Sequence, residues 1–308
     1  MVDAVRLEGV IAPVITPFDD DGEPDAERFV AHAKWLLENG CHALAPFGTT
    51  SEGNSIGLEE RMELLEELVD AGVAPELLMP GTGTCSVSDT VFLTQHAMDL
   101  GCGGVLVLPP FFYKSPSDEG LFRFFSGVIE ETADDTLAVY LYHIPQMSGV
   151  GFSLDLIHRL RGEYPENVVG LKDSSGDWAN MQRILDEVPD FDLFPGSELF
   201  LLDALKKGAA GIISAFANVN SAMMRELYDD PGSDAAEDLQ ARISAFRKIG
   251  QNYPLVQGSK AIIAHYSGDP QWSEVRPPLD PMSAEDQRRL ISDLEGKLSF
   301  SLTIDREA

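Results

Sequence analysis

The sequence predicts an α/β fold, a (β/α)8 barrel of the TIM type with a C-terminal helical extension. Short, continuously apolar runs alternate with longer segments of helical period, and the alternation repeats eight times before residue 230. Continuous apolar runs are typical of parallel strands that are covered on both faces. An open doubly wound sheet is the alternative, and the absence of a GxGxxG turn after the first run argues against it.

Eight apolar runs are the expected strands, and Pro, Gly, Ser or Thr occurs within the last three residues of most of them. They start about 20 to 35 residues apart, which is the spacing of repeated strand–helix units. In chain order they are GVIAPVITPF (9–18), CHALAPFGT (41–49), ELLMPGTG (76–83), GGVLVLPPF (103–111), LAVYLYHIP (137–145), VVGLKDSS (168–175), FDLFPGSE (191–198) and AAGIISAFAN (209–218).

Seven segments of helical period separate these runs, and a turn-rich break, DDPGSD, follows the last run near residue 230. We therefore expect a catalytic barrel over residues 1–230 and a helical extension over residues 231–308 that packs on the barrel. The segments before the break are 25–40, 58–72, 86–101, 117–131, 153–162, 177–188 and 199–208, and those expected to be helices of the extension are 234–252, 258–266 and 283–298.

The composition indicates a cytoplasmic protein that binds neither nucleic acid nor membranes. The chain of 308 residues has a formal net charge of −29, so its surface should repel nucleic acid and anionic membranes. No apolar run reaches the ~20 residues that cross a bilayer, and the N-terminus lacks the features of an export signal. The cysteines, Cys41, Cys85 and Cys102, include no CxxC pair, which is typical of a reducing compartment without disulfides.

In a (β/α)8 barrel, catalytic side chains lie at the carboxyl ends of the strands. Lys172 is the most informative of these positions, because it ends an apolar run in a chain with few lysines. Desolvation favours the neutral form of a lysine amine, and a neutral amine can attack a carbonyl to form a Schiff base. The alternatives are that Lys172 extends to solvent or pairs with Asp173. Lys260, in the extension, is expected to be structural.

A Schiff base needs a proton relay, and Tyr142 ends the neighbouring apolar run. Its hydroxyl can relay protons if a second hydroxyl, such as that of Thr49, is hydrogen-bonded to it; the alternative is a packed core aromatic. Thr49 and Thr50 lie in FGTTSEG, whose hydroxyls and N–H groups can hold a carboxylate, although plain turns have the same composition. Ser197 ends a later run and is a further candidate for substrate binding.

We expect neither a metal nor an organic cofactor. The six histidines are scattered and show no close spacing of the HExxH kind. His143 follows Tyr142 within a strand and should therefore point away from the barrel lumen. The ends of the runs 191–198 and 209–218 lack the glycine-rich turns of a phosphate site, so a phosphorylated substrate is not expected.

FGTTSEG, YHIP and GLKDSSGD occur in an order and spacing that resemble the dihydrodipicolinate synthase / N-acetylneuraminate lyase family of pyruvate-dependent class I (Schiff-base) aldolases. The resemblance implies that Lys172 forms an imine with pyruvate and that Tyr142 relays protons. It implies that Thr49 and Thr50 bind the pyruvate carboxylate, with Thr49 also in the relay, and that the backbone carbonyl of Ile213 lines the site. It further implies a homo-oligomer, commonly a tetramer.

The resemblance extends over about residues 7–300 but includes departures that bear on the substrate. Ser51 replaces the usual glycine of the family's GTTGE turn. Met147 stands where the synthases have an arginine that grips the carboxylate of the aldehyde partner. The synthases also carry a tyrosine pair in the loop after the strand at 103–111, and Tyr113 is the candidate for that role, in a shifted register.

YHIPQMSGV is more similar to the YNIPxxSGV motif of the sugar-acid lyases in the same family. We therefore expect a Schiff-base lyase or aldolase that cleaves or forms a 2-keto-3-deoxy sugar acid, with pyruvate as one component, through a lysine enamine. The alternatives are 4-hydroxy-tetrahydrodipicolinate (dihydrodipicolinate) synthase, a keto-deoxy sugar-acid dehydratase, and a catalytically silent barrel that binds a keto acid.

Overall fold

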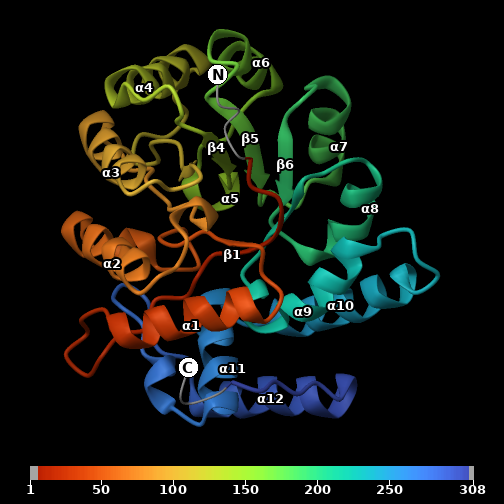
Figure 1. Ribbon diagram of the computed structural model, residues 1–308. Helices are drawn as coiled ribbons and strands as arrows, with labels where there is room; N and C mark the ends of the chain where they lie inside the picture. Colours follow the sequence, from red (N-terminus) through yellow and green to blue (C-terminus); the bar gives the residue numbers. More distant parts are fainter. Residues whose placement is uncertain (1–5, 305–308) are drawn as a thin grey trace.

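The computed structural model describes residues 6–304, in which parallel strands form a barrel surrounded by helices (Figure 1). The strands pair in parallel in two sheets, of order β2-β1-β7 and β3-β4-β5-β6. They are β1 (Gly9–Ala12), β2 (Ala43–Leu44), β3 (Val105–Val107), β4 (Val139–His143), β5 (Val168–Asp173), β6 (Asp192–Pro195) and β7 (Gly211–Ile213).

The run ELLMPGTG does not form the regular strand that was expected. Its start forms a 3₁₀ helix, η2 (Pro75–Leu77), and only the following residues occupy the strand position between β2 and β3. There the Met79 N–H donates to the Leu44 carbonyl (2.8 Å), and the Leu106 N–H donates to the Pro80 carbonyl (2.9 Å). Because proline has no N–H to donate, the ladder is interrupted at this position.

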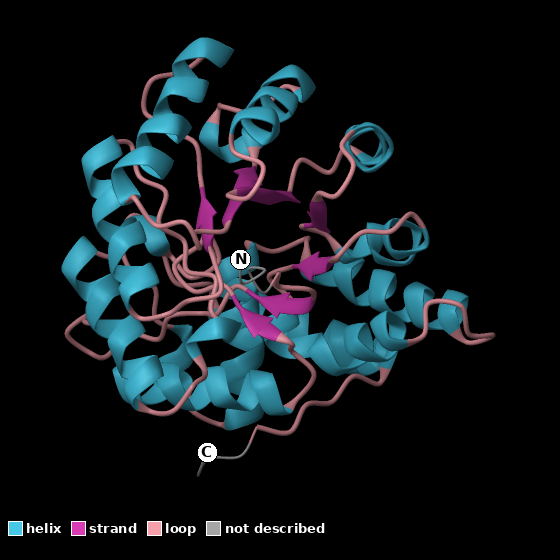
Figure 2. Ribbon diagram, turned by 45° about the horizontal axis from the view of Figure 1, so that its top comes forward, coloured by secondary structure: helices cyan, strands magenta, loops and turns pink. Residues whose placement is uncertain are grey.

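A second backbone connection closes the barrel on the opposite side. The Ala210 N–H donates to the Leu193 carbonyl (3.1 Å) and joins β7 to β6. Figure 2 shows the resulting ring of strands, with the helices outside it. With seven strands and the bridging segment after η2, the ring has eight strand positions, and the predicted (β/α)8 barrel is confirmed.

The barrel helices follow the segments of helical period. Several begin at a capping side chain; the Asp177 carboxylate, for example, accepts hydrogen bonds from the N–H groups of Ala179 and Asn180. The sequence did not predict α9, whose first residues were assigned to the last apolar run, because a short apolar run does not distinguish strand from helix. The helices are α1 (Ala26–Glu38), α2 (Leu58–Asp70), α3 (Val87–Asp99), α4 (Asp118–Thr132), α6 (Leu154–Glu163), α7 (Trp178–Glu187), α8 (Leu201–Lys206) and α9 (Ala217–Asp229), with short helices η1 (Gly53–Ser55), α5 (Pro145–Ser148) and η3 (Glu198–Phe200) in the loops.

The extension consists of α10 (Ala236–Gly250), α11 (Leu255–Ser267) and α12 (Ala284–Leu298), close to the expected ranges, with η4 (Pro270–Ser273) after α11. It packs on α8 and α9 of the barrel, on the side where α1 also lies (Figure 1). Within residues 6–304 no helix combines the length and apolar character needed to span a membrane. The division into units 1–230 and 231–308 stays a prediction.

Two buried layers lie on the two faces of the strands, and β4 shows how they are separated. Val139 and Leu141 pack outward against the helices, whereas Tyr140 and Tyr142 belong to the cluster that fills the lumen. Tyr140 forms the floor of that lumen, where its hydroxyl accepts a hydrogen bond from the Leu7 N–H (2.9 Å). Two residues further along the same face, Tyr142 lies at the carboxyl end of the barrel.

Candidate active site

Lys172 and Tyr142 lie side by side at the carboxyl ends of β5 and β4. The two strands pair in a register that sets Tyr142 opposite Lys172. Both side chains are buried, with 3% and 4% of their surface exposed. The Lys172 Nζ lies 4.3 Å from the centre of the Tyr142 ring. The predicted amine and the predicted relay group therefore meet inside the barrel mouth.

The alternative explanations for Lys172 do not agree with its surroundings. Its low exposure contradicts an amine that extends to solvent. Asp173 lies on the other face of β5, where Oδ1 accepts from the Ser175 N–H (2.8 Å) and Oδ2 accepts from Asn180 Nδ2 (2.8 Å). Among residues 6–304, no carboxylate forms an ion pair with the Lys172 amine. The amine thus has a π face beside it and no fixed counter-ion.

The Tyr142 hydroxyl donates a hydrogen bond to Thr49 Oγ1 at 3.2 Å. This bond joins the end of β4 to the turn after β2, 93 residues earlier in the chain. Tyr142 is therefore not only a packed aromatic, because its polar end is paired with a second hydroxyl at the mouth. An amine, a phenol and an alcohol follow one another here, an arrangement that suits proton transfer at a Schiff base.

The turn that holds Thr49 and Thr50 has an unusual backbone. Phe47 and Glu52, which flank it, have φ angles of 63° and 57°, in the left-handed region that non-glycine residues seldom adopt. Thr16, just beyond β1, donates from Oγ1 to the Ser51 carbonyl (2.8 Å) and fixes the middle of the turn. Such a conformation persists only where neighbouring groups hold it.

Ser51, the departure from the family's glycine, is fully buried in this turn. Its Oγ forms no hydrogen bond with any residue in the part of the chain described. The backbone there does not have a positive φ, so the position does not require glycine. The substitution is therefore compatible with the turn.

Two further predicted residues, Ile213 and Ser197, lie at or just after the ends of later strands. Ile213 ends β7, pairs with Ile11 of β1 and contributes to the lumen. Ser197 caps η3, where its side chain accepts from the Leu199 N–H (3.4 Å). Within residues 6–304, no hydrogen bond joins Ser197 to Lys172.

Tyr113 is not brought to the cluster within one chain. It is 79% exposed, and its ring contacts the Phe112 ring edge to face at 5.3 Å between centroids. Met147, in α5, is also exposed, at 65%. Lys114 connects the two loops that carry these side chains, because its Nζ donates to the carbonyls of Phe111 and Ser148. The predicted roles of Tyr113 and Met147 therefore concern the outer rim of the mouth.

The arrangement of possible metal ligands can be stated for residues 6–304. In the described part of the chain, no group of three or more His, Cys, Asp or Glu side chains is arranged to hold an ion. His143 points away from the lumen, as expected, and its Nδ1 accepts from the Phe152 N–H (3.0 Å). Burial lowers the pKa of its imidazole, and Asp173 opposes this shift.

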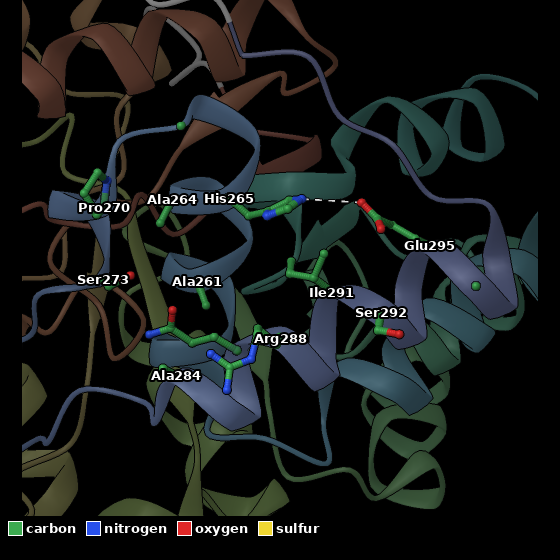
Figure 3. A pocket seen from close by; sticks show the side chains of 13 residues that line it. Ala261, Ala264, His265, Pro270, Ser273, Ala284, Arg288, Ile291, Ser292 and Glu295 are labelled. Carbon is green, nitrogen blue, oxygen red and sulfur yellow. Dashed lines mark ion pairs between the residues drawn. The ribbon is translucent and has the colours of Figure 1, made fainter.

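A small cavity at the mouth is lined by Thr49, Asn54 and Tyr142 together with glycines and apolar side chains. A wider groove, of about 820 Å³, lies between α11 and α12 in the extension. Figure 3 shows this groove, which is lined by alanines and by polar side chains such as Arg288, and where His265 pairs with Glu295 at 3.4 Å. None of the predicted site residues lines it, so size alone does not identify the candidate active site.

Residues 6–297 match the model of the dihydrodipicolinate synthetase family. The chain belongs to this family. It is a lyase of the class I aldolase type, as the resemblance of its motifs predicted.

Individual relatives are similar to this protein over most of its chain. A protein named "Uncharacterized DapA-like lyase" from Chloroflexus aurantiacus is 34% identical over 281 residues, which cover 90% of this chain and 93% of that protein. The crystal structure of dihydrodipicolinate synthase from Agrobacterium tumefaciens is 33% identical, with a TM-score of 0.88 over 94% of this chain and 99% of that one. YagE from E. coli, solved in complex with pyruvate, is 26% identical, with a TM-score of 0.86 over 96% and 100%.

Proposed function

We propose that Lys172 forms a Schiff base with the keto carbon of pyruvate or of a 2-keto-3-deoxy sugar acid. One observation carries the proposal: a buried amine lies against the ring of a tyrosine whose hydroxyl is bonded to Thr49. Thr49 and Thr50 bind the substrate carboxylate in this proposal, and the Ile213 carbonyl lines the pocket. Ser197 and Tyr113 complete the substrate-binding set from the rim.

The proposed cleavage needs no cofactor, because the substrate, water and the side chains of the site supply every proton and electron pair. The neutral Lys172 amine attacks C2 of the keto acid, and loss of water gives an iminium ion. In that dehydration the Tyr142 phenol gives its proton to the departing hydroxide, so that water leaves and a phenolate remains. The phenolate then accepts the proton of the C4 hydroxyl while the C3–C4 bond breaks and its electron pair moves into the iminium, which becomes an enamine. An aldehyde leaves, C3 is protonated, and hydrolysis of the imine releases pyruvate and the free amine. Condensation follows the same steps in reverse.

Met147 supports a sugar acid as the substrate. A thioether cannot donate a hydrogen bond to a carboxylate, whereas an arginine offers a bidentate grip. An aldehyde partner that ends in a carboxylate therefore finds no guanidinium at this position. Glyceraldehyde-like partners, which carry hydroxyls, do not need one. A keto-deoxy sugar-acid dehydratase is an alternative function. It would form the same imine and would not need a guanidinium at position 147.

Dihydrodipicolinate synthase is the second candidate function. It is supported by the relative of that name from Agrobacterium tumefaciens, which is 33% identical. A silent barrel that only binds a keto acid is disfavoured, because the lysine, the tyrosine and the threonine all lie together at the carboxyl end of the barrel.

We also propose that the protein is a cytoplasmic homo-oligomer, a tetramer, in which Tyr113 reaches the mouth of a neighbouring subunit. The rim supports this assembly, because Phe112, Tyr113 and Met147 are 71%, 79% and 65% exposed on two loops joined by Lys114. Large apolar side chains grouped on a surface mark interaction sites. Cys41, Cys85 and Cys102 are unpaired, which agrees with a reducing compartment.

Borohydride trapping tests the proposed chemistry. The protein is incubated with pyruvate and reduced, and the adduct is located by peptide mass spectrometry. We expect the mass of a reduced pyruvyl adduct on the peptide that contains Lys172; its absence would contradict every catalytic function above. A substrate panel then separates the candidates: 2-keto-3-deoxygluconate, 2-keto-3-deoxygalactonate and N-acetylneuraminate for cleavage, and aspartate semialdehyde with pyruvate for condensation. Rapid condensation with aspartate semialdehyde would favour the synthase.

A further inference from the structure

The extension reaches the turn that carries Thr49 and Thr50 through a buried ion pair. Glu52 ends the turn, and its carboxylate Oε1 accepts from the Nζ of Lys260 in α11, 208 residues later in the chain. Both side chains are completely buried. Lys260, which the sequence indicates to be structural, contacts the segment proposed to bind the substrate.

Both oxygens of the Glu52 carboxylate are held by the extension. Oε2 accepts from the backbone N–H of Arg276 at 2.9 Å. Lys260 is fixed in turn, because its Nζ also donates to the Glu274 carbonyl at 2.6 Å and lies 4.5 Å from the centre of the Phe18 ring. Glu52 therefore has one defined position, and it holds the left-handed end of the turn through that position.

Stability alone is a weak reason for such a pair. Two buried charges lose their hydration, and replacement of a buried pair by apolar side chains is often neutral or stabilising. Burial indeed lowers the pKa of Lys260 to about 8, although Glu52 opposes the shift. The contribution left to explain is a geometric one, and a displacement of about 1 Å in a group that positions substrate can cost on the order of a hundredfold in rate.

The same arrangement recurs on another side of the mouth. Glu198, after β6, is 1% exposed, and its Oε2 accepts from Nη1 of Arg247 in α10 at 3.0 Å. Its other oxygen accepts from the hydroxyl of Ser214, the residue after Ile213. Two basic side chains of the extension thus reach buried carboxylates, and each carboxylate holds a strand end proposed to contact substrate.

We propose that Lys260 and Glu52 are positioning residues that fix the Thr49–Thr50 turn, so that affinity for the substrate carboxylate depends on the extension. This inference rests on the proposed function, in which that turn binds the carboxylate. Neither side chain touches the substrate; they act through the backbone of the turn.

The test measures imine formation at different pyruvate concentrations. Wild type, Glu52→Gln, Lys260→Met and the double variant are incubated with pyruvate and reduced with borohydride. The adduct on Lys172 is then quantified. We expect the pyruvate concentration for half-maximal trapping to rise about tenfold or more in the variants, while the maximal adduct stays near one per chain. The matched control is Lys206→Met, because Lys206 of α8 also pairs with a glutamate of the extension, Glu237, at 2.7 Å, but on the exposed surface. It should trap pyruvate as wild type does.

The outcomes are separable. Circular dichroism reports whether each variant folds, and the double variant leaves no unpaired buried charge. A folded Glu52→Gln or double variant with the half-maximal concentration of wild type would overturn the inference, and so would unfolding of all three variants, which would assign the pair to stability alone. Failure of wild type itself to trap pyruvate on Lys172 would instead contradict the proposed function.

Discussion

The Lys172 amine faces the Tyr142 ring at 4.3 Å because β4 and β5 pair Tyr142 directly with Lys172. In a parallel pair, neighbouring residues in register point to the same face of the sheet. A slip of one residue would turn Lys172 outward, where Asp173 now binds Ser175 and Asn180. The contact between amine and phenol is therefore set by the register of two strands.

Lys172→Ala should keep the fold and lose imine formation. The substitution removes a buried amine that has no counter-ion among residues 6–304, so no charged partner is left unpaired there. We expect no borohydride-trapped adduct at any pyruvate concentration, with a circular dichroism spectrum like that of wild type. Lys206→Ala, at an exposed lysine, is the control and should trap normally. An adduct that persists in Lys172→Ala would assign the nucleophile to another lysine.

Tyr142→Phe should still form the imine but turn over slowly. The ring beside Lys172 is kept, whereas the hydrogen bond of 3.2 Å to Thr49 is lost. Because a positioned acid–base group contributes about 10²–10⁴-fold, kcat for sugar-acid cleavage should fall within that range. Thr49→Val removes the partner hydroxyl at similar size and should lower kcat in the same direction. Full turnover by Tyr142→Phe would exclude the phenol from the relay.

The sequence predicts the residues that form the candidate site better than the residues that hold them in position. Lys172, Tyr142 and Thr49 end apolar runs, and the barrel rule brings strand ends together without further information. Lys260 offers no such signal, because its partner Glu52 lies 208 residues away and only the fold brings the two together. Tyr113 shows the opposite limit: it is exposed within one chain, so the role proposed for it requires the neighbouring subunit that is itself a proposal.

Met147→Arg should shift the choice of aldehyde. Met147 is 65% exposed at the rim, so a longer side chain fits there without repacking. A guanidinium that binds a carboxylate contributes about 1.5–3 kcal/mol, or roughly 10–100-fold in kcat/KM. We expect this gain for condensation of pyruvate with aspartate semialdehyde and none for an uncharged aldehyde of similar length. Met147→Leu is the control and should leave the preference unchanged. Equal effects on both aldehydes would exclude position 147 as a specificity determinant.

Asp192 should make stability fall as the pH rises above about 4. It begins β6, its Oδ2 has no hydrogen-bond partner among residues 6–304, and Arg6 lies 3.7 Å from Oδ1. Burial raises the pKa of its carboxyl from 3.8 to about 6, and Arg6 opposes the shift. The folded chain therefore holds this proton where the unfolded chain has lost it, so the contribution of Asp192 is fully present below pH 3.8 and is lost as the pH rises through 6.

Asp192→Asn removes the free-energy cost of ionising a buried carboxyl group and should therefore stabilise the fold at pH 7–8. A shift of this size corresponds to about 1–3 kcal/mol, measurable by urea unfolding, and the advantage over wild type should disappear near pH 4. Asp190→Asn is a matched control of opposite sign: its hydrogen bond to Arg6 lowers the pKa of its carboxyl, so the charged form is favoured in the fold. That variant should be no more stable than wild type at pH 7, and any deficit should shrink as the pH falls below 4. An advantage of Asp192→Asn that is the same at pH 4 and pH 8 would show that Asp192 is already ionised in the fold at pH 4.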